Sequence, residues 1–445
     1  MRSKAYIIFT REPVAGRTKT RMMPYLKPEE CAEFHVCFLK DFSRMIEDVD
    51  ADVFVYYYSE DGDFSTVREC FGDKVSYRPQ SDGDIGCKMH NAITEILAAG
   101  YSSCVLTGSD IPELRADSVN YAFACLENAD AVVGRTADGG YHLIGLNEAC
   151  EAPFMLDGYA DDSVYDRTVA ALEGAGLKVM AGHEYSDMDR PEDLRGFRQR
   201  MLKDERLAAS HTGRFICRML KISIIVPVYN ERSMIESIQN QLRPYKEEAE
   251  IIFVDGGSTD GTVSMISDEF AALTSCKGRA KQMNEGARAS SGDVLFFLHC
   301  DSVIPDDITG QIREVMKTSR YGCFGISFDS RNPFMWTNRL ISNHRAWKKG
   351  IPFGDQGIFI DRELFFEMGG FPDIPIMEDY QFSLNMKSRG YMPGRTRDTI
   401  TTSTRRFGKG IVPVLLTEYR MWKLRSDYRR GADINSFAKS YKDIR

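Results

Sequence analysis

Carboxylates that follow short apolar runs are the residues of this sequence whose type and spacing best suit chemistry. Asp255 closes the apolar run 251–254, and Asp260 follows in a turn rich in glycine, serine and threonine. A short apolar run bounded by turn residues predicts a buried strand of a parallel sheet. Ligands of open α/β sheets bind beyond the carboxyl ends of such strands. Both carboxylates are therefore expected to face a ligand, although Asp260 alternatively caps a short helix.

Three further blocks of the second half place polar side chains at the end of a strand or the start of a helix. They are Pro227, Asn230 and Glu231 at the end of 222–228, His299 and Asp301 after 293–298, and Glu378 and Asp379 before an amphipathic helix. Because the carboxyl ends of parallel strands share one edge of a sheet, these blocks are expected to surround one cleft.

Together these blocks resemble the family-two inverting glycosyltransferases, which have the GT-A fold. Within that family they resemble the "transferase 2" proteins of radical-SAM, selenium-linked and arsenosugar-type gene sets. The resemblance implies transfer of a sugar, of hexosyltransferase type, from a nucleotide-sugar donor to a small-molecule or lipid-like acceptor. It also implies that the nucleobase and ribose lie against Pro227, Asn230, Glu231, Asp255 and Asp260.

The same resemblance assigns the remaining residues of the second half. Asp301 would bind a divalent cation, Mg²⁺ or Mn²⁺, and His299 would be either a nitrogen ligand or a locally hydrogen-bonded side chain. Asp379 would be the catalytic base, with Glu378 as the competing candidate. Further contacts to the nucleotide-sugar are expected from Arg279, Asp355, Gln356, Arg405 and Arg406.

The first half carries a basic loop after its first predicted strand, 5–9. Gly16, Arg17, Lys19 and Arg21 share this loop. Backbone amides and cations at the end of a strand suit a polyphosphate, whereas the alternative is a solvated basic loop. Four more blocks follow in order: Gly83-Asp84-Ile85-Gly86, Ser109-Asp110-Ile111-Pro112, Asp138-Gly139-Gly140-Tyr141 and Asp187-Met188-Asp189.

This ordered set resembles the companion "transferase 1" family of nucleotidyltransferase-like GT-A proteins over about residues 4–200. The resemblance implies that the basic loop contacts phosphates and that Asp110, with Asp187 or Asp189, binds a divalent cation. The chain departs from the family at Asp161-Asp162-Ser163, where the usual tryptophan is absent. The domain is thus either a nucleotidyltransferase that makes the activated sugar or a non-catalytic nucleotide-binding module.

The elements that position these residues alternate between strands and helices, and 445 residues suffice for two full cores. The sequence predicts two α/β GT-A domains in tandem, with mostly parallel sheets flanked by helices. The predicted domains are 1–205 and 220–445, joined by a short connection at 206–219. Two aromatic and basic segments each allow two interpretations. Residues 328–353 are an acceptor surface or a packed loop, and 411–430 a membrane-surface helix or one docked on its own domain.

The composition argues against a nucleic-acid-binding, a disulfide-bonded and a membrane-spanning protein. A net charge of −8 and a pI of about 5.6 argue against nucleic acid as a partner. Eleven cysteines without a Cys-x-x-Cys pair are typical of a reducing compartment. No apolar run reaches the roughly 18 residues of a membrane span. We therefore expect a cytoplasmic enzyme, with peripheral contact to the membrane as an option.

Overall fold

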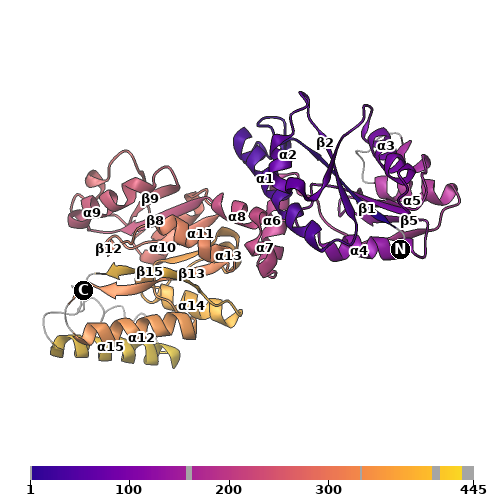
Figure 1. The fold of residues 1–445 in the computed structure, drawn as a ribbon. Coiled ribbons are helices and arrows are strands. Elements are labelled where there is room, and N and C mark those ends of the chain that lie inside the picture. Colours follow the sequence, from indigo (N-terminus) through magenta and orange to yellow (C-terminus); the bar gives the residue numbers. More distant parts are fainter. Residues whose placement is uncertain (1–2, 157–162, 331–332, 403–410, 433–445) are drawn as a thin grey trace. The chain divides into compact units, whose positions relative to one another are not determined.

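The computed structural model describes residues 3–156, 163–330, 333–402 and 411–432. The chain divides into two compact units, Met1–Ile216 and Cys217–Arg445. Each unit is built on its own sheet (Figure 1). Arg405 and Arg406 lie outside the described residues, so their expected contact with the diphosphate stays a prediction.

The sheet of the first unit has the strand order β3-β2-β1-β4-β6-β5-β7. Its strands are β1 (Lys4–Arg11), β2 (Asp52–Tyr58), β3 (Ser76–Pro79), β4 (Ser103–Gly108), β5 (Ala131–Arg135), β6 (Tyr141–Leu146) and β7 (Val179–Ala181). All neighbours are parallel except that β6 runs antiparallel to β4 and β5. The helices are α1 (Pro28–Met45), α2 (Ser65–Phe71), α3 (Ile85–Ala98), α4 (Ala116–Leu126), α5 (Val164–Gly174), α6 (Pro191–Met201), α7 (Glu205–Ala209) and α8 (His211–Arg218).

Strand β1 explains why the sheet needs helices on both faces. Its side chains alternate, so that Tyr6 and Ile8 join a core with Leu39 of α1. Ile7 and Phe9 join the opposite core with Ile93 of α3. A strand buried on both faces reads as a continuous apolar run, which is how β1 appears in the sequence.

The sheet of the second unit has the order β10-β9-β8-β11-β14-β13-β15-β12. Its strands are β8 (Ile222–Val228), β9 (Ala249–Asp255), β10 (Ala271–Thr274), β11 (Val294–Phe297), β12 (Ser302–Val303), β13 (Tyr321–Phe328), β14 (Ile358–Asp361) and β15 (Gly394–Thr402). Strand β14 is antiparallel to β11 and β13, and β12 is antiparallel to β15. The helices are α9 (Arg232–Leu242), α10 (Arg279–Ala289), α11 (Ile308–Met316), α12 (Pro333–Lys349), α13 (Arg362–Glu367), α14 (Glu378–Ser388) and α15 (Ile411–Arg429).

The two sheets share one topology. When the short β12 is set aside, strands β8 to β15 follow the same spatial order as β1 to β7. The reversed strand, β6 or β14, occupies the same place in each sheet. This confirms the predicted fold class of two tandem α/β units with mostly parallel sheets.

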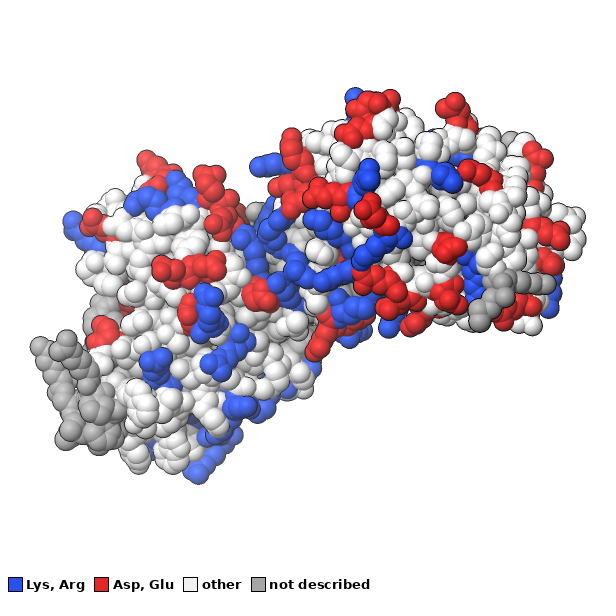
Figure 2. All heavy atoms as spheres, viewed as in Figure 1, with Lys and Arg blue, Asp and Glu red and all other residues white. Residues whose placement is uncertain are grey.

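The segment expected as a connection, 206–219, contains most of α7 and all of α8. The Asp41 carboxylate of α1 accepts hydrogen bonds from the backbone N–H groups of His211 (2.8 Å) and Thr212 (2.9 Å), which caps α8. Phe215 packs on Phe34 with ring centroids 4.9 Å apart. Figure 2 shows Lys and Arg side chains gathered over α6 and α7, where Arg200 is bound by Glu113. Residues 206–216 of this segment are therefore a folded part of the first unit.

Candidate functional sites

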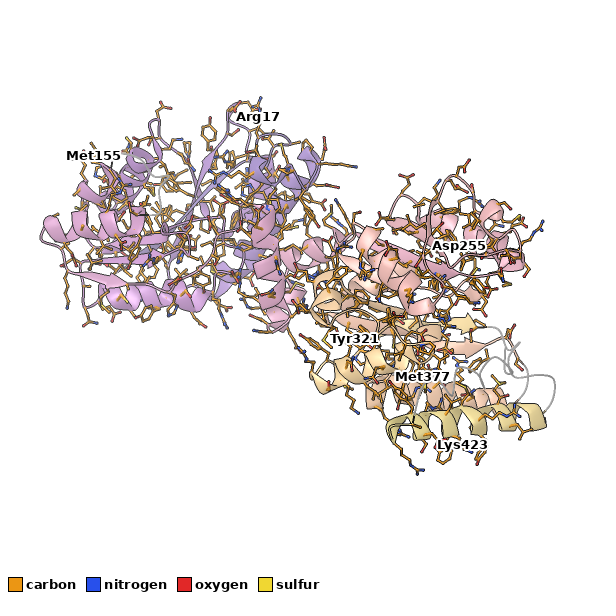
Figure 3. All side chains as sticks on the ribbon, turned by 180° about the vertical axis from the view of Figure 1, so that it is seen from behind. Arg17, Met155, Asp255, Tyr321, Met377 and Lys423 are labelled. Atoms are coloured by element: carbon orange, nitrogen blue, oxygen red, sulfur yellow. The ribbon has the colours of Figure 1, made fainter. Side chains whose placement is uncertain are left out.

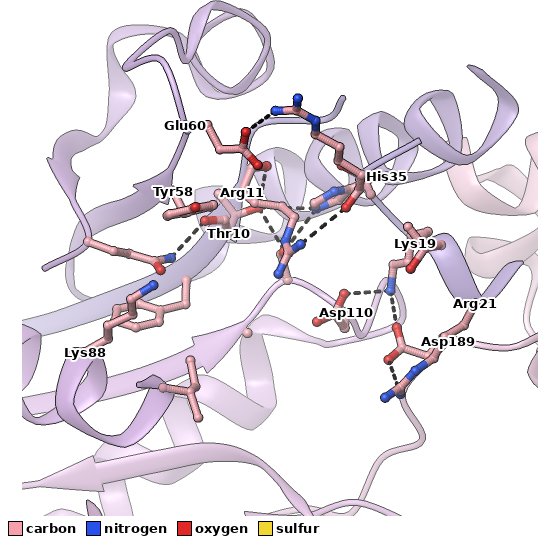
Figure 4. A pocket seen from close by; sticks show the side chains of 18 residues that line it. Thr10, Arg11, Lys19, Arg21, His35, Tyr58, Glu60, Lys88, Asp110 and Asp189 are labelled. Atoms are coloured by element: carbon pink, nitrogen blue, oxygen red, sulfur yellow. Dashed lines mark hydrogen bonds and ion pairs between the residues drawn. The ribbon is translucent and has the colours of Figure 1, made fainter. Parts of the chain in front are cut away.

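The carboxyl ends of β1 and β4 open onto a pocket of about 760 Å³ in the first unit (Figure 4). Its lining combines cations, hydroxyls and three carboxylates from several segments of the chain. The charged and hydroxyl-bearing residues are Thr10, Arg11, Arg17, Thr18, Lys19, Thr20, Arg21, His35, Tyr58, Glu60, Lys88, Ser109, Asp110 and Asp189. Four predicted blocks thus meet at one place: the basic loop, the Gly-Asp-Ile-Gly loop through Ile85, the Ser-Asp-Ile-Pro block and the late Asp-Met-Asp block.

Lys19 is the centre of the charged groups in this pocket. Its Nζ donates hydrogen bonds to Asp110 Oδ1 (2.6 Å), Asp189 Oδ1 (2.8 Å) and the Met188 carbonyl (2.8 Å). The Lys19 side chain is only 3% exposed, and its backbone is left-handed, with φ 50°. Burial acts to lower the pKa of Lys19, but the charges of Asp110 and Asp189 outweigh burial and raise the pKa. The lysine therefore remains a cation that bridges two carboxylates.

The sequence analysis expects Lys19 to contact phosphate and expects Asp110 and Asp189 to bind a cation, but in the structure Lys19 is bonded to both carboxylates. The ammonium lies between the two carboxylates that the sequence assigns to a divalent cation. Among the described residues, no group of three or more His, Cys, Asp or Glu side chains is arranged to hold a metal. The donor set therefore fits a metal ion only if Lys19 moves away.

The other cations of the basic loop are accessible. Arg17 is 60% exposed and pairs with Glu60, while Arg21 is 65% exposed and lies 3.5 Å from Asp189. Gly16 has a φ of 80°, the left-handed conformation that glycine adopts without strain. Arg17 and Arg21, more than Lys19, are thus available to an anionic ligand.

Sequence reasoning missed a buried hydrogen-bond network at the back of the pocket. Ser109 Oγ lies 3.0 Å from Thr10 Oγ1, and His35 Nε2 lies 3.2 Å from Ser109 Oγ and 3.3 Å from Thr10 Oγ1. Burial lowers the pKa of His35 to about 3, so the imidazole is neutral. Ser109 belonged to a recognised block, but nothing in the sequence around His35 marks it as part of a site.

Two further cations were also missed. Arg11, the last residue of β1, lines the pocket, and Lys88 lies over the Tyr58 ring at 4.7 Å from its centroid. Arg11 had a usable signal, because it is the first charged residue after an apolar strand.

In the second unit, the loops after β8 and β9 are joined by their own polar side chains. Asn230, at φ 54°, donates its N–H to Ser258 Oγ (2.8 Å) and accepts from the Thr259 N–H (2.9 Å). Asp255 (Figure 3) is 4% exposed and accepts from the N–H groups of Gly257 (2.9 Å) and Ser258 (3.0 Å). Pro227 lies in β8 beside Val254 of β9. These residues shape the loops at the carboxyl ends of β8 and β9.

Asp260 acts as a cap beside these two loops. Its carboxylate accepts from the N–H groups of Thr262 (2.9 Å) and Arg232 (3.2 Å), the first residue of α9. The hydrogen bond from the Thr262 hydroxyl lowers the pKa of Asp260. The neighbouring Glu231 donates its backbone N–H to Thr262 Oγ1 (2.9 Å).

The segments that carry His299, Gly354 and Asp379 converge at one point. The Gly354 N–H donates to Asp379 Oδ2 at 2.7 Å. A Cβ added at Gly354 would lie 2.8 Å from His299 Nε2 and 3.2 Å from Asp379 Oδ2. The glycine is therefore what allows the imidazole and the carboxylate to share this place. Asp301 follows His299 by two residues and lies within the turn that the Ser302 N–H closes onto the His299 carbonyl.

Glu378 and Asp379 occupy different environments although they are adjacent. Met377 (Figure 3), just before α14, has φ 65°, a strained conformation for a residue with a Cβ. Glu378 is 3% exposed, and its Oε1 lies 3.4 Å from Arg279 Nη1 of α10. Glu378 thus holds Arg279, whereas Asp379 faces His299.

Gln356 differs from its expected role as a nucleotide-sugar contact. It is fully buried. Its Oε1 accepts from the Phe353 N–H (3.2 Å) and Arg345 Nη2 (3.3 Å), and its Nε2 donates to Asn343 Oδ1 (3.5 Å). Asp355, next to it in the 3-10 turn Gly354–Gln356, is half-buried. Gln356 therefore stabilises the turn from its buried side.

Comparisons with known proteins match the two halves separately. Residues 223–372 match the family "Glycosyl transferase family 2", which confirms the resemblance predicted for the second half. Residues 42–159 match "Uncharacterized protein conserved in bacteria (DUF2064)". The narrower "transferase 1" and "transferase 2" subfamilies stay predictions.

Individual relatives cover only part of the chain. The poly-beta-1,6-N-acetyl-D-glucosamine synthase of Staphylococcus epidermidis is 32% identical over 94 residues, which is 19% of this chain and 23% of that protein. The chain spans about a quarter of the length of this synthase and of the "Uncharacterized glycosyltransferase YfnE" of Bacillus subtilis. A nucleotide-diphospho-sugar transferase structure from Desulfovibrio desulfuricans G20 is 26% identical, with a TM-score of 0.46, over 48% of this chain and 94% of that one.

Proposed function

We propose that the second unit transfers a sugar from a nucleotide-diphospho-sugar to a small-molecule or lipid-like acceptor, with inversion at the anomeric carbon. One observation carries the proposal: His299, Gly354 and Asp379 converge in a unit whose residues 223–372 match the family-two glycosyltransferases. The loops after β8 and β9 would take the nucleoside, since ligands of α/β sheets bind beyond the carboxyl ends of the strands.

Asp301 and His299 are the residues that would hold a divalent cation. A carboxylate and an imidazole two residues apart are a donor set that suits Mn²⁺ or Mg²⁺, and the imidazole lies beside Gly354. Such an ion, when bound, supplies positive charge for a leaving diphosphate.

Asp379 would act as the general base. Its carboxylate accepts the proton of the acceptor as the acceptor oxygen bonds to the anomeric carbon. The bond from that carbon to the diphosphate breaks, and the nucleoside diphosphate leaves with the electron pair. Backbone N–H groups of Gly354 and Tyr380, each at 2.7 Å, fix both carboxylate oxygens. Glu378 would be a positioning residue that keeps Arg279 near the donor.

The test is the substitution Asp379→Asn in the full chain. It keeps the shape of the side chain and removes the proton acceptor. We expect a loss of roughly 10²-fold or more in kcat, with little change in donor affinity. The matched control is Glu378→Gln, which should instead weaken donor binding because Arg279 loses its anchor. Normal turnover in the Asp379 variant beside an inactive Glu378 variant would show that the base is misassigned.

For the first unit we propose a nucleotide site at the pocket after β1 and β4. Exposed Arg17 and Arg21, together with Arg11 and Lys88 on the pocket wall, support an anionic ligand. Synthesis of the activated sugar used by the second unit is the candidate reaction, with nucleotide binding alone as the alternative. All eleven cysteines are free, which supports the cytoplasm as the proposed location.

A further inference from the structure

Helices α12 and α15 lie side by side along one edge of the second unit (Figures 1 and 3). Together they display large apolar side chains to solvent. These are Trp336 (63% exposed), Leu340 (49%) and Ile341 (61%) on α12, and Leu416 (51%), Tyr419 (60%) and Trp422 (56%) on α15. We refer to these six residues and the cations around them as the α12–α15 surface.

The outward position of these side chains follows from helical spacing. On α12, Met335, Asn338, Ser342 and Ala346 are buried, at intervals of three and four residues. Trp336, Leu340 and Ile341 lie on the other side of the helix and remain about half exposed or more, so α15 contacts α12 without covering them.

Helix α15 is fixed to its unit by its opposite side. Leu424 is 8% exposed, and the Tyr428 hydroxyl donates to Gln381 Oε1 of α14 at 2.6 Å. The Tyr428 and Tyr380 ring centroids are 6.1 Å apart. The helix is therefore docked on its own domain, and the six apolar side chains are left over after docking.

The charge of the two helices contrasts with the rest of the chain. Helix α12 contains no acidic residue, and the acidic residues of α15 are Glu418 and Asp427. Arg345 and Arg425 are used against the Phe353 ring. Exposed cations remain at Lys348, Lys349, Arg420, Lys423 and Arg429, in a chain with a net charge of −8. Lys423 lies on the outer helix of the unit (Figure 3).

We propose that the α12–α15 surface docks the protein on the surface of an anionic phospholipid bilayer. Tryptophan and tyrosine side chains favour the level of the lipid headgroups. Helices with aromatic residues beside Lys and Arg lie in that interface, and the cations are attracted to anionic lipids. A second copy of this chain is a poorer occupant, because a symmetric contact would bring identical cations together. The inference is independent of the proposed transferase reaction.

The experiment is sedimentation of the full chain with lipid vesicles. The protein should sediment with vesicles of phosphatidylcholine and phosphatidylglycerol, and not with phosphatidylcholine alone. Arg420→Glu with Lys423→Glu should weaken partitioning by roughly 30-fold or more, because each cation near an anionic surface contributes about a factor of five. The tryptophan fluorescence should shift to the blue on the anionic vesicles, and Trp336→Ala with Trp422→Ala should abolish most of that shift.

The matched control reverses two exposed cations elsewhere in the second unit, Arg288→Glu with Arg397→Glu. It should bind the anionic vesicles as the unaltered chain does. Equal binding of the Arg420 and Lys423 variant, or failure of the unaltered chain to bind, would overturn the proposal. Sedimentation equilibrium without lipid adds a separate outcome. If the tryptophan variant turns a dimer into a monomer, the surface joins two copies and the membrane proposal is wrong.

Discussion

Gly354 is a position where one added methyl group should lower the catalytic rate and leave the stability of the protein nearly unchanged. A Cβ there would lie 2.8 Å from His299 Nε2 and 3.2 Å from Asp379 Oδ2, so one of these side chains must shift by tenths of an ångström. We expect Gly354→Ala to lower kcat by roughly 10- to 100-fold, because a small misplacement of a reacting group is costly. Thermal unfolding and donor titration should change little. Gly174→Ala, where the new Cβ meets nothing within 4 Å, is the control, and equal turnover in both variants would contradict the role of Gly354.

The roles of several residues could not be predicted from the sequence, because they depend on partners that lie far away along the chain. A basic loop predicts solvated side chains, yet Lys19 is buried by carboxylates that are 91 and 170 residues away. Gln356 reads as a polar residue after a glycine turn, but Asn343 and Arg345 of α12 enclose its amide. The place of Asp255 at the end of β9 was predictable from the sequence because it follows an apolar run, whereas its contact with a nucleotide stays a prediction.

At the scale of elements, the strands were the most predictable feature. Buried parallel strands such as β8, β9 and β11 are continuous apolar runs, and turn residues mark their ends. Helix α12 was not predicted as a helix, since its aromatic and polar residues show no clear apolar stripe in the sequence. Helix α8 was assigned to a connection for a similar reason, because its packing depends on Phe34 and Asp41 of α1.

Helix α8 leads to a prediction about where the first unit can be cut. A fragment of residues 1–205 lacks α8, which leaves Phe34 without Phe215 and Asp41 without its backbone donors. We expect its free energy of unfolding to be at least about 3 kcal/mol below that of residues 1–219, the size of a Phe→Ala change in a core. Urea unfolding of both fragments measures the difference. In residues 1–219, Phe215→Ala should reproduce much of the loss; identical midpoints would mean that α8 is dispensable.

At the scale of the whole molecule, the candidate sites of the two units predict separable functions. Arg17→Ala with Arg21→Ala in the full chain should weaken binding of a nucleoside triphosphate by roughly tenfold or more, since charge-assisted contacts to phosphate are lost. Turnover by the second unit, supplied with a finished nucleotide-sugar, should be unchanged. Calorimetry measures the nucleotide affinity, and a transferase assay on the same preparation measures the turnover. Unaltered nucleotide affinity would favour the solvated-loop interpretation.

The shared strand order of the two sheets has a consequence for how the chain reaches its native state. Two neighbouring domains of one topology can exchange equivalent strands during folding, and such misassembly is a typical failure of tandem repeats. Each unit here is contiguous in sequence, so synthesis completes every strand of the first sheet before β8 emerges. The equivalent first strands have also diverged, KAYIIFTR in β1 against ISIIVPV in β8, with a proline that cannot donate a ladder hydrogen bond. Refolding from denaturant removes the order imposed by synthesis, and the full chain should then recover less completely than its separate halves.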